Sequence, residues 1–485
     1  MPPTRWLRAG KTVRVAVGCV ALVLFGCEAV LGLGDLQERS DTDASTNGPD
    51  AGTPEGAADG GSDGGIFNNI TDLAKWDVCD LTEITRDARN GFTGGTFDGR
   101  YLYLAPRSNQ LLRLDTSMPG AFCTAAAWKA FRLVETTADG GRLAVGAYAG
   151  SIYDGSRYVY FVPSVGVSGA LAHVSLRYDT QADFASPASW LGFDTSAHLG
   201  RLAHGFIGGV FDGHYVYFVP NGYTFPGSDP NGLVVRYDVN GPFQDSASWT
   251  SVNLVTLLTE APTQFAGGLY QAPYVYFIPQ YTQYVTRYDT RLPLDVATSW
   301  ATYDITTGGG AAPPYGFAGG AVVGTQIYLA PFLNAQGSYA AYGTVFKHDT
   351  AALADGFTNS GSWQRFDTKA LPARPGGFYG AVADGRWVYF APDYRNAADA
   401  GPDGSTVTFP SGDLARFDTT GTFTLAESWQ VFNISTVNAG ATSFAGAIFD
   451  GTFVYFPPSG GGGTLMARFH ARAAPAPPPF TPSFL

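Results

Sequence analysis

The sequence repeats one unit seven times, and this repetition limits the possible folds more than any other feature of the chain. The unit reads Gly-Phe-x-Gly-Gly-x-Phe-Asp-Gly-x-Tyr-Val-Tyr-Phe-x-Pro and is followed by a basic-x-Asp segment and a tryptophan. Its glycine column is Gly94, Gly150, Gly208, Gly267, Gly319, Gly380 and Gly446. Its tyrosine column is Tyr103, Tyr160, Tyr217, Tyr276, Tyr328, Tyr389 and Tyr455, each followed three residues later by proline. Its tryptophan column is Trp76, Trp128, Trp190, Trp249, Trp300, Trp363 and Trp429.

Each unit predicts four β-strands, one each for the glycine-rich, Tyr-Val-Tyr, basic-x-Asp and tryptophan segments. The Asp-Gly pair between the first two segments, as in Asp98-Gly99, is a strong hairpin signal. Repeats of this length with four strands each are typical of β-propellers, whose sheets stack face to face around an axis. Small residues suit the crowded innermost strands, which would account for the glycine column. We therefore expect an all-β, seven-bladed β-propeller with four antiparallel strands per blade.

The phase of the repeat predicts how the ring closes. Trp76 precedes the first complete unit, whereas the last unit stops at Arg468-Phe469-His470 with no tryptophan after it. The N-terminal strand around Trp76 should therefore supply the fourth strand of blade seven, which would hydrogen-bond two otherwise open edges. On this interpretation the chain tolerates deletion as far as Ile70 but not through Ile84.

The repeat resembles kelch and galactose-oxidase-type propellers, whose blades also carry glycine pairs, a tyrosine and a spaced tryptophan. The resemblance covers roughly residues 70 to 471 and implies a shared architecture. In kelch blades the glycine pair ends the second strand, whereas here it lies in the first strand and proline takes the later place. Kelch partners and oxidase chemistry therefore do not carry over to this chain.

Residues 1–26 have the pattern of an export signal. Four basic residues precede an apolar run, Val15 to Gly26, that is too short for a bilayer, which needs about 20 residues. The run ends in Leu24-Phe25-Gly26-Cys27, which resembles the lipobox of bacterial lipoproteins, a family in which the cysteine is lipidated. The resemblance implies lipidation at Cys27 and a place in the bacterial outer membrane or at the cell surface. A membrane-spanning helix is the alternative.

The remaining boundaries follow from composition. Residues 27–65 predict a flexible tether, because from Asp41 to Gly65 they are mainly Asp, Ala, Gly, Ser, Thr and Pro and cannot bury a core. Residues 66–472 are left for the propeller, and 473–485 form a proline-rich tail. The net charge of −12 argues against a nucleic-acid partner, because phosphate binding needs a basic face. We expect a monomer.

Catalytic patterns are scarce in this sequence. It has no His-Glu-x-x-His and no phosphate loop, and its one close histidine pair, His198 and His204, is too loosely spaced to predict a metal site. We therefore expect no cofactor and no metal. The basic-x-Asp pair, as in Arg177 and Asp179, places two charges on one strand face, where they can pair with each other or with the next blade. Its recurrence in nearly every unit indicates structural ion pairing rather than an active site.

Two cysteines lie in the propeller region, Cys79 and Cys123. Cys79 stands three residues after Trp76, where other units carry an aromatic residue such as Phe131. Cys123 lies near the same edge of the neighbouring blade one, and exported proteins can form disulfides. A Cys79–Cys123 bridge and a free core cysteine both remain open.

Function is expected where the copies differ. The loops between second and third strands, and those between blades, open on one face of a propeller and vary most in this sequence. Their aromatic and charged residues are the candidate ligand-binding residues: Tyr223, Phe225, Asp229, Tyr281, Tyr284, Tyr339, Tyr342, Tyr394, Arg395, Asp399 and Asp403. The tyrosines at 281, 284, 339 and 342 are expected to be exposed.

These observations favour an exported, lipid-anchored propeller that binds a glycan or an envelope protein and does not catalyse a reaction. One alternative is a propeller hydrolase or lyase that acts on extracellular polysaccharide, with loop carboxylates as general acid and base. A second alternative is a purely structural surface protein.

Overall fold

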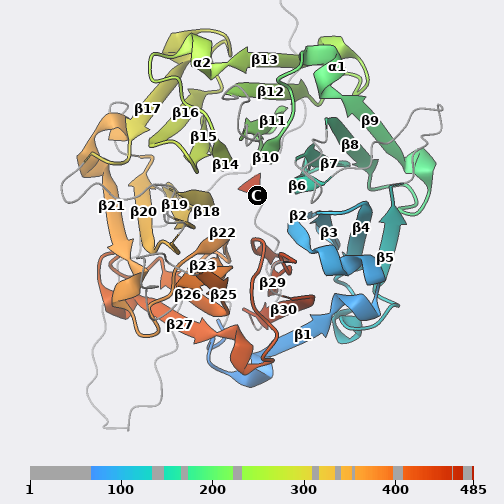
Figure 1. Cartoon of the computed structure of the whole chain (residues 1–485), viewed down its shortest axis with the longest axis vertical. Helices are drawn as coiled ribbons and strands as arrows, with labels where there is room; N and C mark the ends of the chain where they lie inside the picture. The colour runs from blue at the N-terminus through green and yellow to red at the C-terminus, as the bar shows by residue number, and fades with distance from the viewer. Residues whose placement is uncertain are drawn as a thin grey trace, which may run out of the picture. The chain divides into compact units, whose positions relative to one another are not determined.

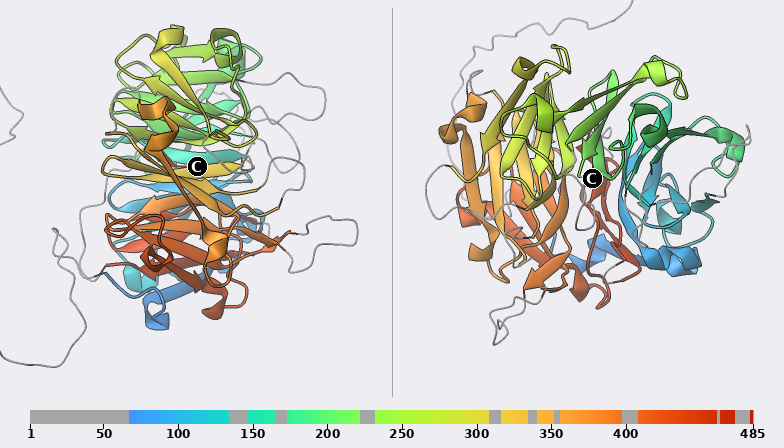
Figure 2. Two further views of the ribbon diagram at one scale, coloured as in Figure 1. Left: turned by 90° about the vertical axis from the view of Figure 1, so that its left-hand side faces the viewer. Right: turned by 45° about the horizontal axis from the view of Figure 1, so that its top comes forward.

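The computed structural model describes residues 67–133, 147–164, 173–221, 232–307, 316–333, 340–351, 356–396, 408–460, 463–472 and 483–484. In these residues seven antiparallel sheets, each built on a blade of four strands, surround one axis (Figure 1). Their strands run between the two faces of the ring (Figure 2). The expected seven-bladed β-propeller is therefore confirmed.

The first six blades use their strands in chain order, innermost first. Blade one is β2 (Phe92–Phe97), β3 (Tyr101–Pro106), β4 (Gln110–Asp115) and β5 (Trp128–Arg132). Blade two is β6 (Tyr148–Tyr153), β7 (Tyr158–Pro163), β8 (Val174–Asp179) and β9 (Trp190–Asp194). Blade three is β10 (Phe206–Phe211), β11 (Tyr215–Pro220), β12 (Leu233–Asp238) and β13 (Trp249–Asn253).

Blade four is β14 (Phe265–Gln271), β15 (Tyr274–Pro279), β16 (Tyr284–Asp289) and β17 (Trp300–Asp304). Blade five is β18 (Phe317–Val323), β19 (Gln326–Pro331), β20 (Thr344–Asp349) and β21 (Trp363–Asp367). Blade six is β22 (Phe378–Ala383), β23 (Trp387–Pro392), β26 (Asp413–Asp418) and β27 (Trp429–Asn433), with a separate hairpin of β24 (Tyr394–Asn396) and β25 (Thr408–Pro410) between its second and third strands.

Helical elements in the described part of the chain are short. Its α-helices are α1 (Thr195–Leu199) and α2 (Leu254–Leu257), and none of its helices combines the length and apolar character of a membrane span. Turns of 3-10 helix precede tryptophan strands at Leu73–Lys75, Pro187–Ser189, Ser246–Ser248, Ala297–Ser299, Ser360–Ser362 and Ala426–Ser428. Other 3-10 turns are Leu81–Glu83, Arg86–Asn90, Pro119–Ala121, Gly356–Thr358, Thr368–Ala370 and Ile434–Thr436.

Blade seven joins the two ends of the propeller. It consists of β28 (Ile448–Phe449), β29 (Phe453–Phe456), β30 (Leu465–His470) and the N-terminal strand β1 (Trp76–Asp80). All of β1 pairs antiparallel with β30, from Trp76 opposite Phe469 to Asp80 opposite Leu465. The expected closure of the ring is therefore confirmed.

The closing segment begins earlier than the sequence suggested. Ile70, expected to be dispensable, is 0% exposed, and its carbonyl accepts a 2.8 Å hydrogen bond from Trp76 Nε1. The backbone N–H of Asn68 donates to Ala471 O at 2.9 Å, and Phe67 forms a β-bridge with Arg472. Residues 67–70 therefore belong to the closure, and we expect the loss of Ile70 to destabilise the ring, in contrast to the expectation from the sequence.

The tryptophan column joins each blade to its neighbour. In all seven blades the indole N–H donates to the backbone carbonyl six residues earlier, at 2.6 to 3.1 Å. At five interfaces the ring also stacks on an aromatic residue of the preceding blade's fourth strand, as Trp190 does on Phe131 with centroids 4.8 Å apart. One hydrogen bond and one stack thus fix the outer edge of a blade.

The glycine column is explained by backbone conformation. All seven glycines have φ between 64° and 106°, the left-handed region that favours glycine. In blades one to six they lie at β-bulges of the inner strand, for example between Phe206 and Gly209 in β10, whereas Gly446 of blade seven lies just before β28. Crowding, the reason expected from the sequence, is clear at the residue that follows the column where that residue is also glycine. A Cβ on Gly95 would lie 2.3 Å from Tyr103 O, whereas the atom nearest to a Cβ on Gly446 would be 3.7 Å away.

The repeated charges form a structural network, as expected, in which the basic residue contacts the next blade and the aspartate pairs with the Asp-Gly turn. Asp115 does not pair with Arg113; it accepts from Arg100 of the Asp-Gly turn at 2.8 Å. Arg113 lies 4.0 Å from the Tyr101 ring centroid and donates to the Tyr178 hydroxyl of blade two at 3.0 Å. The repeated pair therefore links turns and neighbouring blades rather than forming a site.

The C-terminal end of the chain lies inside the ring. Strand β31 (Ser483–Phe484) lies at the centre of the view in Figure 1 and pairs antiparallel with β10 through Val210 and Gly209. It also contacts β6 and β14. Part of the segment expected to be a tail is therefore a fifth strand on the inner edge of blade three.

Three truncations test the closure. A chain that starts at Phe67 should melt like the full-length protein, and one that starts at Thr71 should be about 2–4 kcal/mol less stable, because it loses Ile70 and its hydrogen bond. A chain that starts at Thr85 lacks β1 and should aggregate, because losing Trp76 and its neighbours removes much of a typical stability of about 5–15 kcal/mol. Thermal unfolding followed by circular dichroism measures the order. Equal melting temperatures for all three would contradict closure by β1.

Candidate functional site

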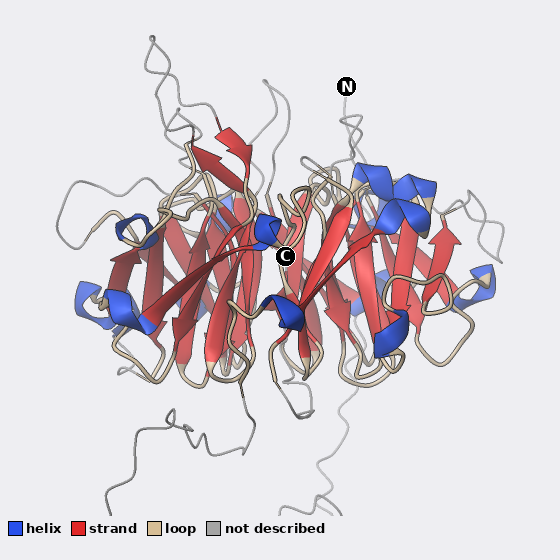
Figure 3. Cartoon of the chain, turned by 90° about the horizontal axis from the view of Figure 1, so that it is seen from below, coloured by secondary structure: helices blue, strands red, loops and turns tan. Residues whose placement is uncertain are grey.

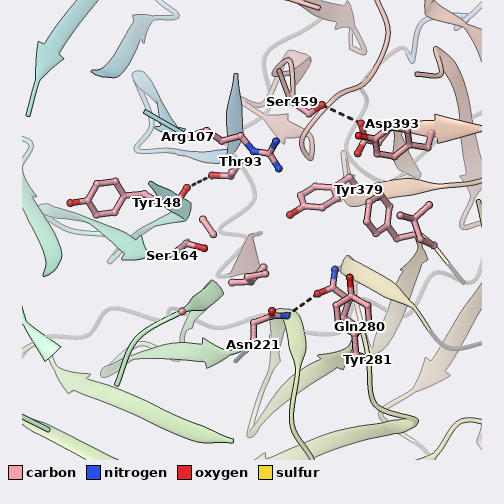
Figure 4. Close-up of a pocket in the computed structure, with 16 residues that line it drawn as sticks. Thr93, Arg107, Tyr148, Ser164, Asn221, Gln280, Tyr281, Tyr379, Asp393 and Ser459 are labelled. Carbon is pink, nitrogen blue, oxygen red and sulfur yellow. Dashed lines mark hydrogen bonds between the residues drawn. The ribbon is translucent and has the colours of Figure 1, made fainter. Parts of the chain in front are cut away.

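A cavity of about 440 Å³ lies on the axis of the ring (Figure 4). It opens on the face where the second strands end, named here the proline face after Pro106, Pro163 and their equivalents; the Asp-Gly turns lie on the opposite face. The volume falls within the roughly 300–1,000 Å³ that is typical of ligand sites. Figure 3 shows the β24–β25 hairpin standing out from one face of the ring.

One position of the repeat supplies a residue to this cavity from every blade. It is the residue directly after the proline of the second strand: Arg107, Ser164, Asn221, Gln280, Phe332, Asp393 and Ser459. The surrounding positions repeat, whereas this column holds six residue types in seven copies. That contrast is the sequence signal that could have located the site; none of the candidate residues expected from the sequence belongs to this column.

The β-bulges supply a second set of lining residues. In β10 the bulge leaves Ile207 and Gly208 between the paired residues Phe206 and Gly209, and Ile207 lines the cavity. Tyr379 occupies the equivalent position in β22 and points toward the centre of the cavity (Figure 4). The same distortion that requires glycine therefore turns the preceding side chain toward the axis.

Asp393 is the buried acid of the cavity, with 4% of its surface exposed. The hydroxyls of Ser443 and Ser459 both donate to Asp393 Oδ1, the second at 3.2 Å. Burial raises the pKa of Asp393 to about 6, against the two serine hydrogen bonds and the charge of Arg107, which lower it. The carboxyl therefore changes charge close to neutral pH.

Arg107 is the cation of the cavity. It is half-buried, and its guanidinium points into the cavity (Figure 4). Within the described residues its side chain forms no hydrogen bond or ion pair, with Asp393 or with any other group. Its charge nevertheless lowers the pKa of Asp393, so the two groups lie within electrostatic range of each other.

An amide pair forms the opposite wall. Asn221 Nδ2 donates to Gln280 Oε1 at 2.8 Å and to the backbone oxygen of Phe265 at 2.7 Å. Asn221 is 1% exposed, and its Oδ1 has no hydrogen-bond partner among the described residues. Because the Gln280 oxygen is already used, the pair has one buried amide oxygen without a partner, that of Asn221, and one NH₂ group beside it, that of Gln280. A buried polar atom without a partner costs roughly 1–3 kcal/mol, which a ligand would recover.

The residues expected from the sequence are divided between several places. Tyr281 and Tyr394 line the cavity, whereas Tyr284 begins β16 and does not. Arg395 is exposed in the β24–β25 hairpin. Tyr342, expected to be exposed, is 7% exposed and packs edge-on against Phe317, because it belongs to the core between two blades. Tyr223, Phe225, Asp229, Tyr339, Asp399, Asp403 and Cys27 lie outside the described residues.

No side chains in the described ranges form a group of three or more His, Cys, Asp or Glu residues that could hold a metal ion. The fold and the cavity define a β-propeller protein with a ligand-sized site on its axis.

Comparisons with known proteins agree on the fold alone. No protein-family model and no curated protein sequence matches the chain. It is similar to virginiamycin B lyase from Staphylococcus aureus, with a TM-score of 0.50 and 12% identity over 82% of this chain and 99% of that one. It is also similar to the extracellular domain of a hybrid two-component system protein from B. thetaiotaomicron, with a TM-score of 0.50 and 10% identity over 86% of this chain and 44% of that one.

Cys79 and Cys123 lie side by side as free thiols. Cys79 is buried in β1, and Cys123 is exposed in the β4–β5 connection of blade one. Burial raises the pKa of Cys79, and its hydrogen bond with Cys123 raises it further. The two sulfurs therefore connect the closing strand to the next blade across one interface.

Mild oxidation should join Cys79 to Cys123, because each thiol donates to the backbone carbonyl next to the other cysteine, Cys79 to Phe122 O at 3.8 Å and Cys123 to Val78 O at 3.5 Å. The bridge would tie β1 to blade one and should add about 2–4 kcal/mol of stability, the usual range for such a closure. Peptide mapping without reductant and thermal melting measure the two effects. Cys123→Ser is the control and should gain nothing on oxidation; a wild-type protein that keeps two free thiols would contradict the prediction.

Asp393→Asn tests how much folding stability is lost when the buried carboxyl of Asp393 ionises. The folded state raises the pKa of Asp393 from 3.8 to about 6, so the wild type loses stability as pH rises through that interval. The variant should equal the wild type in free energy of unfolding at about pH 4 and exceed it by roughly 2–3 kcal/mol at about pH 8. Urea unfolding at each pH measures the difference. A difference that does not change with pH would show that Asp393 is not destabilised by ionisation.

Proposed function

We propose that this chain is an exported, lipid-anchored β-propeller that binds a ligand in its axial cavity at the bacterial cell envelope. The observation that carries the proposal is the post-proline column, in which every blade contributes a residue and the residues differ. A purely structural ring has no need for one unequal position at its centre. In architecture the blades are of the kelch type that the repeat resembles.

The lining of the cavity supports binding rather than polysaccharide cleavage. Glycoside hydrolysis usually requires two carboxyl groups on opposite sides of the bond. Of the lining residues that the structure describes, Asp393 is the one with a carboxyl group. Phe332, Tyr379 and the Asn221–Gln280 pair instead provide an apolar wall and fixed hydrogen-bonding groups, which are typical of recognition sites.

A ligand screen separates the proposed function from its alternatives. The protein from Phe67 onward should bind at least one compound in a screen of saccharides, peptides and amino acids by thermal shift and calorimetry. Asn221→Leu should lose that binding, because it removes the buried amide oxygen, whereas Arg395→Ala on the same face should keep it. Product formation would favour the hydrolase or lyase, and no binding at all would favour the structural protein.

The proposed anchor is tested at Cys27. The lipobox-like sequence Leu24-Phe25-Gly26-Cys27 and the length of the segment up to residue 65 support a membrane-tethered propeller. Cys27→Ala should move the protein from the membrane fraction to the soluble fraction, as measured by fractionation and immunoblotting. A distribution that still requires detergent would show that another segment anchors the chain.

A further inference from the structure

Two opposite charges face the axial cavity without pairing with each other. The carboxyl of Asp393 is held by Ser443 and Ser459, and within the described residues the guanidinium of Arg107 forms no ion pair. The two groups lie near enough for the charge of Arg107 to act on the Asp393 carboxyl. Here the fold holds them on different blades, one and six, at the rim of one cavity. A ligand that carries both charges could bridge them.

The far wall of the cavity adds a second complementary feature. Asn221 Oδ1 is buried without a partner in the described structure, so it needs a donor from outside the chain. Gln280 can offer its NH₂ group beside this oxygen, because its own oxygen accepts from Asn221. An amide oxygen next to an amide NH₂ matches another amide group, whose N–H and C=O lie at a similar spacing.

We propose that the axial cavity binds a free amino acid or short peptide in its zwitterionic form, an inference that rests on the proposed ligand-binding function. The carboxylate of the ligand binds Arg107, and its ammonium group binds Asp393. An amide group of the ligand binds Asn221 and Gln280. Its aliphatic part packs against Phe332 and Tyr379, which line the same cavity.

The charge of the protein favours this ligand over an acidic sugar. The chain carries a net charge of −12, so it repels anions at long range, whereas a zwitterion has no net charge. An acidic sugar would also bring its carboxylate into the field of Asp393. A neutral sugar would leave the charges of both Arg107 and Asp393 uncompensated in a partly buried site, which costs binding free energy.

Three forms of one dipeptide test the assignment. Alanyl-glutamine has both terminal charges; N-acetyl-alanyl-glutamine lacks the ammonium group, and alanyl-glutamine amide lacks the carboxylate. We expect calorimetry to show that each blocked form binds the wild type about 10- to 100-fold more weakly than the parent, because each loses one charge-assisted contact.

Two variants connect each charge to its partner. Arg107→Gln should bind the parent and the carboxyl-blocked dipeptide equally, because it cannot recognise the carboxylate. Asp393→Asn should bind the parent and the acetylated dipeptide equally, while Asn still accepts the serine hydrogen bonds. Arg395→Ala is the control on the same face and should keep all wild-type ratios.

The outcomes distinguish this inference from the function on which it rests. Equal wild-type affinity for all three dipeptides, or unchanged ratios in both variants, would overturn the zwitterion assignment. Binding of saccharides with no binding of any dipeptide would overturn it as well and leave the ligand-binding function standing. Failure of the wild type to bind any compound would remove both.

Discussion

The antiparallel pairing of β1 with β30 is the interaction on which the rest of the structure depends. It joins residues almost four hundred positions apart and completes the seventh blade. The axial cavity takes residues from all seven blades, so it exists only when the ring is closed. Trp76 contributes to this closure in two ways, through its hydrogen bond to Ile70 and through its stacking on Phe432 of blade six. The stability of blade seven and the geometry of the ligand site are therefore coupled.

The architecture could be predicted from the sequence because its causes repeat. The tryptophan is the same in each copy because its indole N–H must reach a carbonyl six residues earlier. The glycine is the same in each copy because its backbone has a left-handed conformation. Seven copies of such a pattern specify the blade, the number of blades and the strand that closes the ring. The burial of Ile70 was not predicted, because the equivalent position is Phe or Leu in the other blades and the isoleucine does not match that pattern.

The site could not be predicted in the same way, because its residues do not share a pattern. Arg107, Asn221, Gln280 and Asp393 come together only through the rotation of the blades around the axis, and each stands alone in its own loop. The candidates chosen from the variable loops included Tyr281 and Tyr394, which line the cavity, but not Asn221 or Asp393, with which two of those loops begin. The prediction that Tyr342 is exposed was wrong because a tyrosine beside a loop can turn inward and fill the space between two blades.

Buried carboxyl groups in this protein are of two kinds, and the difference separates structure from function. Asp384 and Asp450 are also buried with a raised pKa, but each accepts a tyrosine hydroxyl and two backbone N–H groups, and this arrangement recurs at the Asp-Gly turns of other blades. Asp393 has no counterpart in the other six blades, and the cation nearest to it in the cavity is left without an ion pair in the described structure. Natural sequences depart from consistent local rules mainly where function requires it. The fold satisfies the polar groups of its repeat in nearly the same way in all seven blades. At its centre it leaves two opposite charges unpaired and one amide oxygen without a hydrogen-bond donor. The free energy that this costs is what a bound ligand can offset.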